Sequence, residues 1–166
     1  MKRINFNSEK CMNCGFCELA CAVAHSTNKD IIECFREFDG LPSRIEINKI
    51  DSNNIEANFC HNCEYPPCEE ICITGAITKK EGYVNYDTKK CVACWSCIMA
   101  CPFDAIKANS EGNHTIRCDG CGDWTNPVCV QICPTGALYF EEPEKQPIKK
   151  RINYGRYLAQ KYYIDK

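Results

Sequence analysis

Cysteine is the residue type whose number and spacing point most directly to chemistry in this chain. The 166 residues include 17 cysteines, about a tenth of the total, which is far above ordinary usage. At that density cysteine builds disulfide scaffolds, zinc sites or iron–sulfur clusters. The stretch CVACWSCIMACP, residues 91–102, holds four cysteines separated by two, two and three residues, so the spacing has to distinguish these three chemistries.

Sixteen of the cysteines fall into four motifs that share one pattern. Each motif starts with CxxC and ends with CxxxC, and only the gap between these halves varies, over two, four, two and seven residues. The motifs cover residues 11–21, 60–72, 91–101 and 118–133. We interpret them as four copies of one metal-binding unit. The remaining Cys34 is expected to be a small buried hydrophobic residue.

Disulfides do not fit this chain. The cysteine count is odd, so complete pairing within one chain is impossible. The first residues, MKRINFNSEK, contain neither an apolar leader nor a twin arginine, and without an export signal we expect a cytoplasmic, reduced protein. Because no stretch approaches the roughly 18–20 apolar residues of a membrane span, none is expected.

The order of the spacings favours iron–sulfur clusters over zinc. Zinc is typically held by two CxxC halves, and a structural zinc-binding assembly module is the alternative of another class. The run CxxCxxC instead allows three thiolates to bind one compact group, such as a cluster, and the fourth thiolate has to come from another part of the chain. Closed by CxxxCP, this run is typical of bacterial [4Fe–4S] sites, in which the last cysteine binds the other cluster. We therefore predict four [4Fe–4S] clusters, although proline follows only Cys101 and Cys133.

The elements that position these cysteines are predicted to be short. A short helix carries each closing CxxxC, because positions three or four apart lie on one helical face. Two β-hairpins are expected, in TKKEGYVNYD around Gly82 and in KANSEGNHTI around Gly112. The alternation in RIEINKI indicates a strand that covers one side of the clusters. The expected fold class is α+β, with short helices and β-hairpins wrapped around four clusters that supply much of the folding free energy.

Charge argues against nucleic acid as a partner. The formal net charge is −2 with the cysteines counted as neutral, and four oxidised clusters with their thiolates would bring it to about −10. No broad basic surface is expected on such a protein. Basic residues do precede the first cysteine of three motifs, at Lys10, Lys90 and Arg117. Solvent exposure is the expected state of all three, with an effect on cluster potential as the alternative.

Nothing in the sequence resembles a substrate-activating constellation, such as a catalytic triad, a glycine-rich phosphate loop or a nucleotide fingerprint. With sixteen thiolates completing four sites, His25, His61 and His114 are expected to make hydrogen bonds or lie at the surface rather than bind metal. The chain is therefore predicted not to be an enzyme by itself. A one-electron relay is the favoured function, because four clusters within 166 residues must lie close together.

At these motifs the chain resembles the four-cluster, ferredoxin-like electron-transfer subunits of bacterial and archaeal oxidoreductases. Members of that family accompany dimethyl sulfoxide reductase, formate dehydrogenase, hydrogenases and carbon monoxide dehydrogenase. CHNCEYPPC is similar to the family's second motif, and CELACAVAHS (17–26) is most similar to the small iron–sulfur protein paired with nickel carbon monoxide dehydrogenase. The resemblance implies tandem ferredoxin-like modules in a polyferredoxin domain over residues 1–140, with an insertion at 22–59. Residues 141–166 form a C-terminal extension, whose expected helix either packs over the clusters or docks an enzyme subunit.

The spacing leaves two arrangements of the motifs open, because motif three can pair with motif two or with motif four. The resemblance implies that motifs two and three form one pair and motifs one and four the other, each exchanging its last cysteine. The implied ligand sets are Cys11, Cys14, Cys17 and Cys133 for cluster 1; Cys118, Cys121, Cys129 and Cys21 for cluster 2; Cys60, Cys63, Cys68 and Cys101 for cluster 3; and Cys91, Cys94, Cys97 and Cys72 for cluster 4.

The resemblance also implies the partners. We expect a hetero-oligomer in which the chain carries electrons between a low-potential redox enzyme and a ferredoxin, flavoprotein or hydrogenase. Carbon monoxide dehydrogenase is the first choice for that enzyme. A tungsten aldehyde oxidoreductase, a formate dehydrogenase or a hydrogenase would use the same kind of relay.

Overall fold

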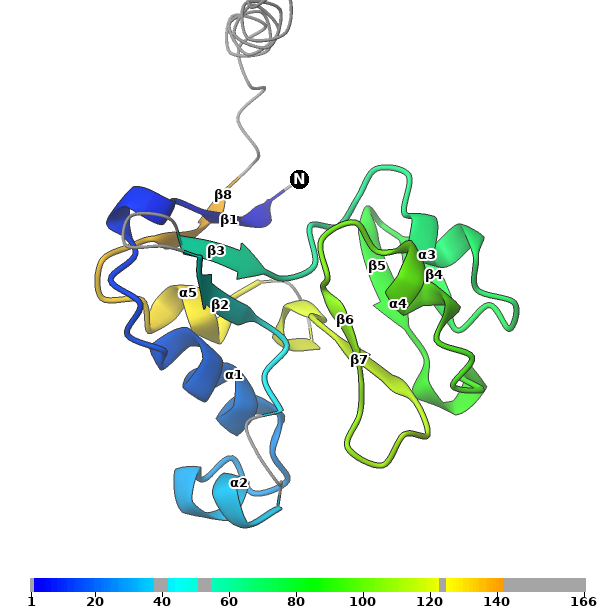
Figure 1. Ribbon diagram of the computed structural model, residues 1–166, viewed down its shortest axis with the longest axis horizontal. Helices are drawn as coiled ribbons and strands as arrows, with labels where there is room; N and C mark the ends of the chain where they lie inside the picture. The colour runs from blue at the N-terminus through cyan, green and yellow to red at the C-terminus, as the bar shows by residue number, and fades with distance from the viewer. Residues whose placement is uncertain (1, 38–41, 51–54, 123–124, 142–166) are drawn as a thin grey trace, which may run out of the picture.

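A computed structural model describes residues 2–37, 42–50, 55–122 and 125–141 (Figure 1). Along these residues the chain forms five α-helices: α1 (Phe16–His25), α2 (Ile31–Glu37), α3 (Pro67–Glu70), α4 (Ser96–Ala100) and α5 (Val128–Gln131). The same residues form eight strands: β1 (Arg3–Phe6), β2 (Glu46–Lys49), β3 (Ile55–Asn58), β4 (Ile77–Lys80), β5 (Tyr83–Tyr86), β6 (Ile106–Ala108), β7 (Thr115–Arg117) and β8 (Leu138–Glu141). Short 3₁₀ turns lie at Ser8–Lys10, Thr88–Lys90 and Gly120–Gly122. The mixture of short helices and strands confirms the α+β class.

Both predicted hairpins are present. In β4–β5 the residues Lys80 and Tyr83 face each other, which leaves Glu81 and Gly82 as a two-residue turn. Both turn residues have positive φ, of 52° and 84°, as the turns that match the twist of a hairpin require. β6 and β7 pair across the longer predicted loop. The predicted strand in RIEINKI is β2, which pairs with β3.

The predicted helices carry the closing CxxxC only in part. α1 contains both Cys17 and Cys21, whereas α3, α4 and α5 contain the first cysteine of the pair and end before the second. Proline follows Cys101 and Cys133, and it disfavours a helical backbone at the residue before it. In motif one Ala22 takes that place and α1 continues for another turn, whereas in motif two α3 ends before Cys72 although Ile73 follows it.

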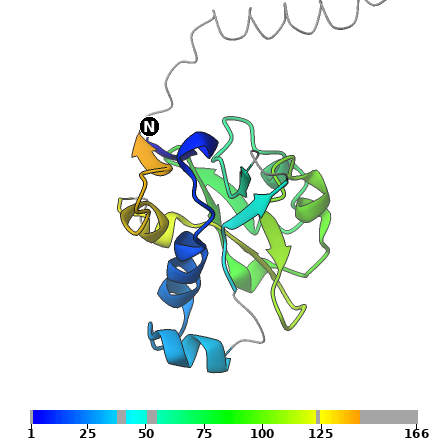
Figure 2. The ribbon, with the colours of Figure 1, turned by 60° about the vertical axis from the view of Figure 1, so that its left-hand side comes forward.

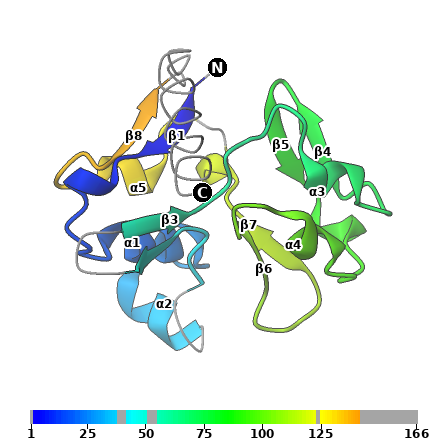
Figure 3. The same cartoon turned by 45° about the horizontal axis from the view of Figure 1, so that its top comes forward.

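The pairing of the two ends of the described chain was not predicted. β1 and β8 run antiparallel, with Arg3 opposite Glu141 and Phe6 opposite Leu138. α1 packs against α5, as Figure 2 shows, and α3 packs against α4. Motif one therefore lies beside motif four, and motif two beside motif three. In Figure 3 the β1–β8 pair and the β4–β5 hairpin lie on opposite sides of the molecule.

The helix α2 in the insertion was also not predicted. Ile31, Cys34 and Phe35 have the i, i+3, i+4 spacing of an apolar helix face, although Ile31, Ile32 and Phe35 are exposed in the structure. The carboxylate of Asp30 accepts hydrogen bonds from the backbone N–H groups of Ile32 and Glu33 and so caps the helix start. On the inner side of α2, Cys34 is fully buried, as predicted.

Two apolar cores follow the two pairs of motifs. The first consists of Ile4, Cys17, Cys21, Ile45, Phe59, Cys129 and Leu138. The second consists of Cys68, Ile77, Val84, Cys97 and Ile106. Because motif cysteines are members of both cores, whatever these cysteines bind becomes part of the packed interior.

Within the described ranges, no helix combines the length and the apolar character needed to cross a bilayer. The predicted C-terminal helix lies outside the described residues, which end at 141.

Candidate metal centres

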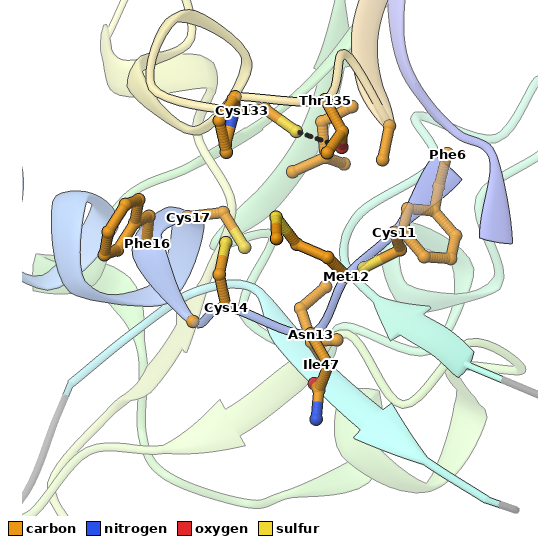
Figure 4. A pocket seen from close by; sticks show the side chains of 14 residues that line it. Phe6, Cys11, Met12, Asn13, Cys14, Phe16, Cys17, Ile47, Cys133 and Thr135 are labelled. Carbon is orange, nitrogen blue, oxygen red and sulfur yellow. Dashed lines mark hydrogen bonds between the residues drawn. The ribbon is translucent and has the colours of Figure 1, made fainter. Parts of the chain in front are cut away.

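The motif cysteines line four cavities in the described structure. Each cavity holds three cysteines from one motif and a fourth from another. We name them site 1 (Cys11, Cys14, Cys17, Cys133), site 2 (Cys21, Cys118, Cys121, Cys129), site 3 (Cys60, Cys63, Cys68, Cys101) and site 4 (Cys72, Cys91, Cys94, Cys97). In Figure 4 the sulfurs of site 1 face a common space, although they come from α1, the segment before it and the loop before β8.

These four groups of cysteines are the same groups that the family resemblance implies as ligand sets. Cys133 of motif four lies with motif one, and Cys101 of motif three lies with motif two. The tertiary contacts account for this placement, because β1–β8 and α1–α5 join motifs one and four while α3–α4 joins motifs two and three. The last cysteine of each motif therefore lines a cavity together with three cysteines of the neighbouring motif.

The cavities fit a group larger than a single ion. The four cavities are lined alike, each by four cysteines from two motifs. Among the described residues, no group of three or more Cys, His, Asp or Glu side chains is placed to hold one metal ion. The sulfurs therefore surround a space rather than converge on a point. A cubane with four corner irons, each taking one thiolate, suits this arrangement better than a tetrahedral zinc ion.

A left-handed residue precedes the second cysteine of every motif. Asn13, Asn62, Ala93 and Gly120 have φ values of 56°, 46°, 52° and 64°. A left-handed residue in such a turn aims successive backbone N–H groups at one point and creates a concave anion site. Asparagine and glycine adopt this conformation readily, whereas alanine there costs about 1–2 kcal/mol. The CxxC turns are therefore shaped to receive thiolates.

The third cysteine of each motif is buried at the base of its cavity. Cys17, Cys68, Cys97 and Cys129 are between 5% and 9% exposed. Burial raises the pKa of Cys17 and Cys129 to about 12 and the pKa of Cys68 to about 11. Thiolates at these positions need a bound cation to stabilise them, so metal binding there releases protons.

Cys72 and Cys133 have the opposite tendency. Burial acts to raise their pKa values, but hydrogen bonds from backbone N–H groups and from a threonine hydroxyl two residues later lower them overall. The hydroxyl oxygens of Thr74 and Thr135 lie 3.8 Å from the two sulfurs, and Figure 4 shows the second of these contacts. The repeated sequence TGA after these cysteines is therefore a thiolate-binding loop.

Glycine makes these loops possible. Gly75 and Gly136 have φ values of 62° and 63°, which turn the backbone N–H groups back toward the preceding cysteine. Asp104 holds the equivalent place after Cys101, with φ of 47°. The repeat in CITGAI, CPFDAI and CPTGAL is thus a repeat of backbone conformation as well as of sequence.

Polar groups surround Cys21 in site 2. The Nδ1 of His25 lies 3.7 Å from the Cys21 sulfur and 2.7 Å from the Cys21 carbonyl oxygen, and its Nε2 lies 3.0 Å from the Asp119 carboxylate. Burial acts to lower the pKa of His25, but Asp119 and Cys21 raise it to about 9. The backbone N–H of Arg44 lies 3.3 Å from the same sulfur, and its guanidinium forms an ion pair with Asp119. His25 therefore makes hydrogen bonds, as predicted.

The basic residues before the first cysteines differ in burial. Lys10 and Lys90 are exposed, as expected. Arg117 is only 3% exposed, so the expectation of a solvated side chain is wrong at this position. Alternation along β7 places Thr115 and Arg117 on its buried face. The Nη2 of Arg117 lies 2.7 Å from the sulfur of Cys60 in site 3.

His61 is stacked between two phenylalanine rings. Its ring centroid lies 4.7 Å from that of Phe59 and 4.2 Å from that of Phe103. Burial lowers the pKa of His61, which favours the neutral ring. Phe59 lines site 2, whereas His61 and Phe103 line site 3, so the stack fills the space between these two sites.

The sites follow one another in the order 1, 2, 3, 4. The third and fourth cysteines of motif one line sites 1 and 2, and those of motif three line sites 4 and 3. Sites 2 and 3 meet near Cys118, whose pKa is raised first by burial and then by the charge of Cys60. Sites 1 and 4 are therefore the two ends of the series.

Exposure distinguishes these two ends. Among the 17 cysteines, all of which the structure describes, the exposed ones are Cys14 in site 1 and Cys94 in site 4. Exposed apolar side chains lie close to both in the sequence, with Met12 at 63%, Val92 at 60% and Met99 at 87%. Each end thus combines an exposed cysteine with at least one exposed apolar side chain close to it in the sequence.

Comparison with known proteins agrees with this chemistry. Residues 52–143 match the profile of the 4Fe-4S dicluster domain. An iron-sulfur protein of Rhodospirillum rubrum is 36% identical, over 94% of this chain and 90% of its own length. The putative electron transport protein YsaA of Escherichia coli is 38% identical over 84% and 88%, and the electron transport protein HydN of Escherichia coli is 34% identical over 84% and 87%. These relatives confirm the prediction of an iron–sulfur electron-transfer subunit rather than an enzyme in its own right.

Proposed function

Since this chain belongs to the 4Fe-4S dicluster domain family, we propose that it relays single electrons through four [4Fe–4S] clusters. The observation that carries the proposal is the gathering of sixteen cysteines into four cavities, with four sulfurs in each. When bound, such a cluster accepts or gives up one electron with little rearrangement.

The residues of the chain would hold and shield these clusters. The proposed ligands are the four cysteines of each site, with the last cysteines of motifs one and four exchanged and those of motifs two and three exchanged. Left-handed CxxC turns and the TGA loops direct N–H groups at the sulfurs. The apolar residues of both cores exclude water. Hydrogen bonds and solvent exclusion are the properties by which a protein sets cluster potentials.

Electrons would enter at one end of the series and leave at the other. Cys14 and Cys94 are the exposed ligands, so the shortest paths from a partner lead to sites 1 and 4. The two middle sites lie deeper and connect the ends. A chain with two separate ports serves two partners, which supports the proposal of a hetero-oligomeric complex.

We propose a low-potential redox enzyme as the first partner and a ferredoxin, flavoprotein or hydrogenase as the second. Carbon monoxide dehydrogenase is our first choice of enzyme, on the similarity of CELACAVAHS at residues 17–26. Aldehyde, formate and hydrogen-oxidising enzymes release electrons in pairs too, and a one-electron relay would serve each of them. A cytoplasmic location is part of the same proposal.

Anaerobic metal analysis tests the cofactor content. We expect about sixteen irons and about sixteen acid-labile sulfides per chain, one cubane for each site. About eight irons or fewer, together with stoichiometric zinc, would contradict the proposal.

Rapid mixing tests the partner. The reconstituted protein is combined with each candidate enzyme and its substrate, and the loss of visible cluster absorption is followed over time. Fast bleaching with carbon monoxide and its dehydrogenase supports the first choice. If only an aldehyde, formate or hydrogen system bleaches the protein, the enzyme of that system replaces carbon monoxide dehydrogenase as the proposed partner. The proposed relay function is then unaffected.

A further inference from the structure

The guanidinium of Arg117 is buried against the sulfur of Cys60. Arg117 ends β7 and lines site 3 together with the four cysteines of that site. Its Nη2 donates to the Cys60 sulfur across 2.7 Å, which makes a charge-assisted hydrogen bond to the thiolate. At 3% exposure, water screens this charge very little.

Among the described residues, no carboxylate forms an ion pair with Arg117. Its Nε and Nη1 atoms are buried and have no hydrogen-bond partner within the same part of the chain. Arg44, by contrast, pairs with Asp119 near site 2. A buried cation without a counter-charge is strongly unfavourable, so site 3 itself has to supply the negative charge.

The other basic residues at equivalent places do not act in this way. Lys10 and Lys90 also precede the first cysteine of a motif, but both are exposed, and Lys90 lies 3.9 Å from the carboxylate of Asp87. Water and a counter-ion weaken their effect on sites 1 and 4. Among the three basic residues that precede the first cysteine of a motif, the buried one is therefore Arg117 at site 3.

We propose that Arg117 raises the reduction potential of site 3, so that an electron within the series of four sites is held preferentially at this inner site. The inference builds on the proposed relay function. Reduction adds one negative charge to a cluster that is already negative with its thiolates. A fixed cation at a ligand sulfur stabilises the reduced state more than the oxidised state, and a hydrogen bond to the sulfur acts in the same direction. Arg117 is thus a residue that sets a potential, without touching a substrate.

The test compares Arg117→Gln with Lys90→Gln. Each change removes one cation before the first cysteine of a motif, one buried and one exposed. Redox titrations followed by electron paramagnetic resonance give the potential of each cluster, and Cys60→Ser identifies the signal of site 3. We expect Arg117→Gln to shift the reduction equilibrium of site 3 at least tenfold toward the oxidised form, which is about 59 mV for one electron. Lys90→Gln is expected to shift every cluster by less than about threefold.

An unchanged potential of site 3 in Arg117→Gln, with all iron retained, overturns the inference and leaves the relay intact. If Arg117→Gln loses the iron of site 3, Arg117→Lys tests the role of the charge instead, because lysine keeps the positive charge and changes the shape of the side chain. A retained cluster at the wild-type potential in Arg117→Lys supports the role of the charge, whereas loss or a lowered potential there overturns it. Absence of clusters from the wild-type protein contradicts the proposed function itself.

Discussion

Replacing Cys11 and Cys133 together is expected to remove no more iron than replacing either one alone. The two residues belong to different motifs, yet both line site 1. Cys21 belongs to the same motif as Cys11, yet it lines site 2. Each cysteine is changed to alanine, which offers no ligand. The two double variants then separate binding within a motif from binding across motifs.

The magnitude follows from the number of sites. Four sites with four cysteines each correspond to about sixteen irons, so the loss of one site removes about four. Cys11→Ala, Cys133→Ala and the double variant are each expected to lose about four irons. Cys11→Ala combined with Cys21→Ala is expected to lose about eight, because two sites are then damaged. Binding within each motif predicts the reverse, about eight for the first pair and about four for the second.

Iron and sulfide analysis of anaerobically purified protein measures these losses, and electron paramagnetic resonance of the reduced protein shows which signals disappear. Cys34→Ala is the matched control, because Cys34 is fully buried but lines none of the four sites. This control is expected to keep all its iron. A loss of about eight irons from the Cys11 and Cys133 pair would refute the assignment of site 1.

Two further predictions concern the ends of the series and the CxxC turns. Met12→Glu and Met99→Glu are each expected to slow electron exchange with a different partner at least tenfold, equivalent to about 1.4 kcal/mol. Rapid mixing measures the rate of electron exchange with each partner. Tyr65→Glu, at an exposed residue of motif two, is the control and is expected to slow neither exchange. Slowing of both exchanges by one variant, or a similar effect of Tyr65→Glu, would argue against two separate ports. Ala93→Gly is expected to raise the free energy of unfolding by about 0.5–1 kcal/mol, because glycine relieves the left-handed backbone at φ of 52°. Ala20→Gly inside α1 is expected to lower the free energy of unfolding by about 1 kcal/mol. Unfolding by denaturant under anaerobic conditions measures both changes, and two changes of the same sign would contradict the reasoning.

The hairpins and the cysteine motifs were predictable because their determinants are local. Gly82 stands at a two-residue turn between alternating strands, and the ladder of that hairpin joins residues close in the sequence. The CxxC spacing is local in the same way, since one turn of backbone brings the two sulfurs to one side. Helix ends were less predictable, because motifs one and two both lack a proline after the last cysteine, yet α1 continues past Cys21 and α3 ends before Cys72.

The contacts around the sites were not predictable, because they join distant parts of the chain. His25 and Asp119 are 94 positions apart, and neither residue carries a local signal that it will meet the other. Arg117, Lys10 and Lys90 have the same local context, a cation before a CxxC turn. Only the packing of β7 against site 3 separates the buried one from the exposed ones.

The sequence alone determined that sixteen cysteines stand in four repeated motifs with the spacing of iron–sulfur ligands, because ligand type and spacing are properties of a few adjacent residues. It left open which motif exchanges its last cysteine with which, since a spacing of residues contains no information on distant neighbours. The tertiary structure places motif one beside motif four and motif two beside motif three, through the β1–β8 ladder and the contacts of α1 with α5 and of α3 with α4. It also decided which charges lose their water, and burial of a charge depends on everything packed around it rather than on the residues beside it in the chain.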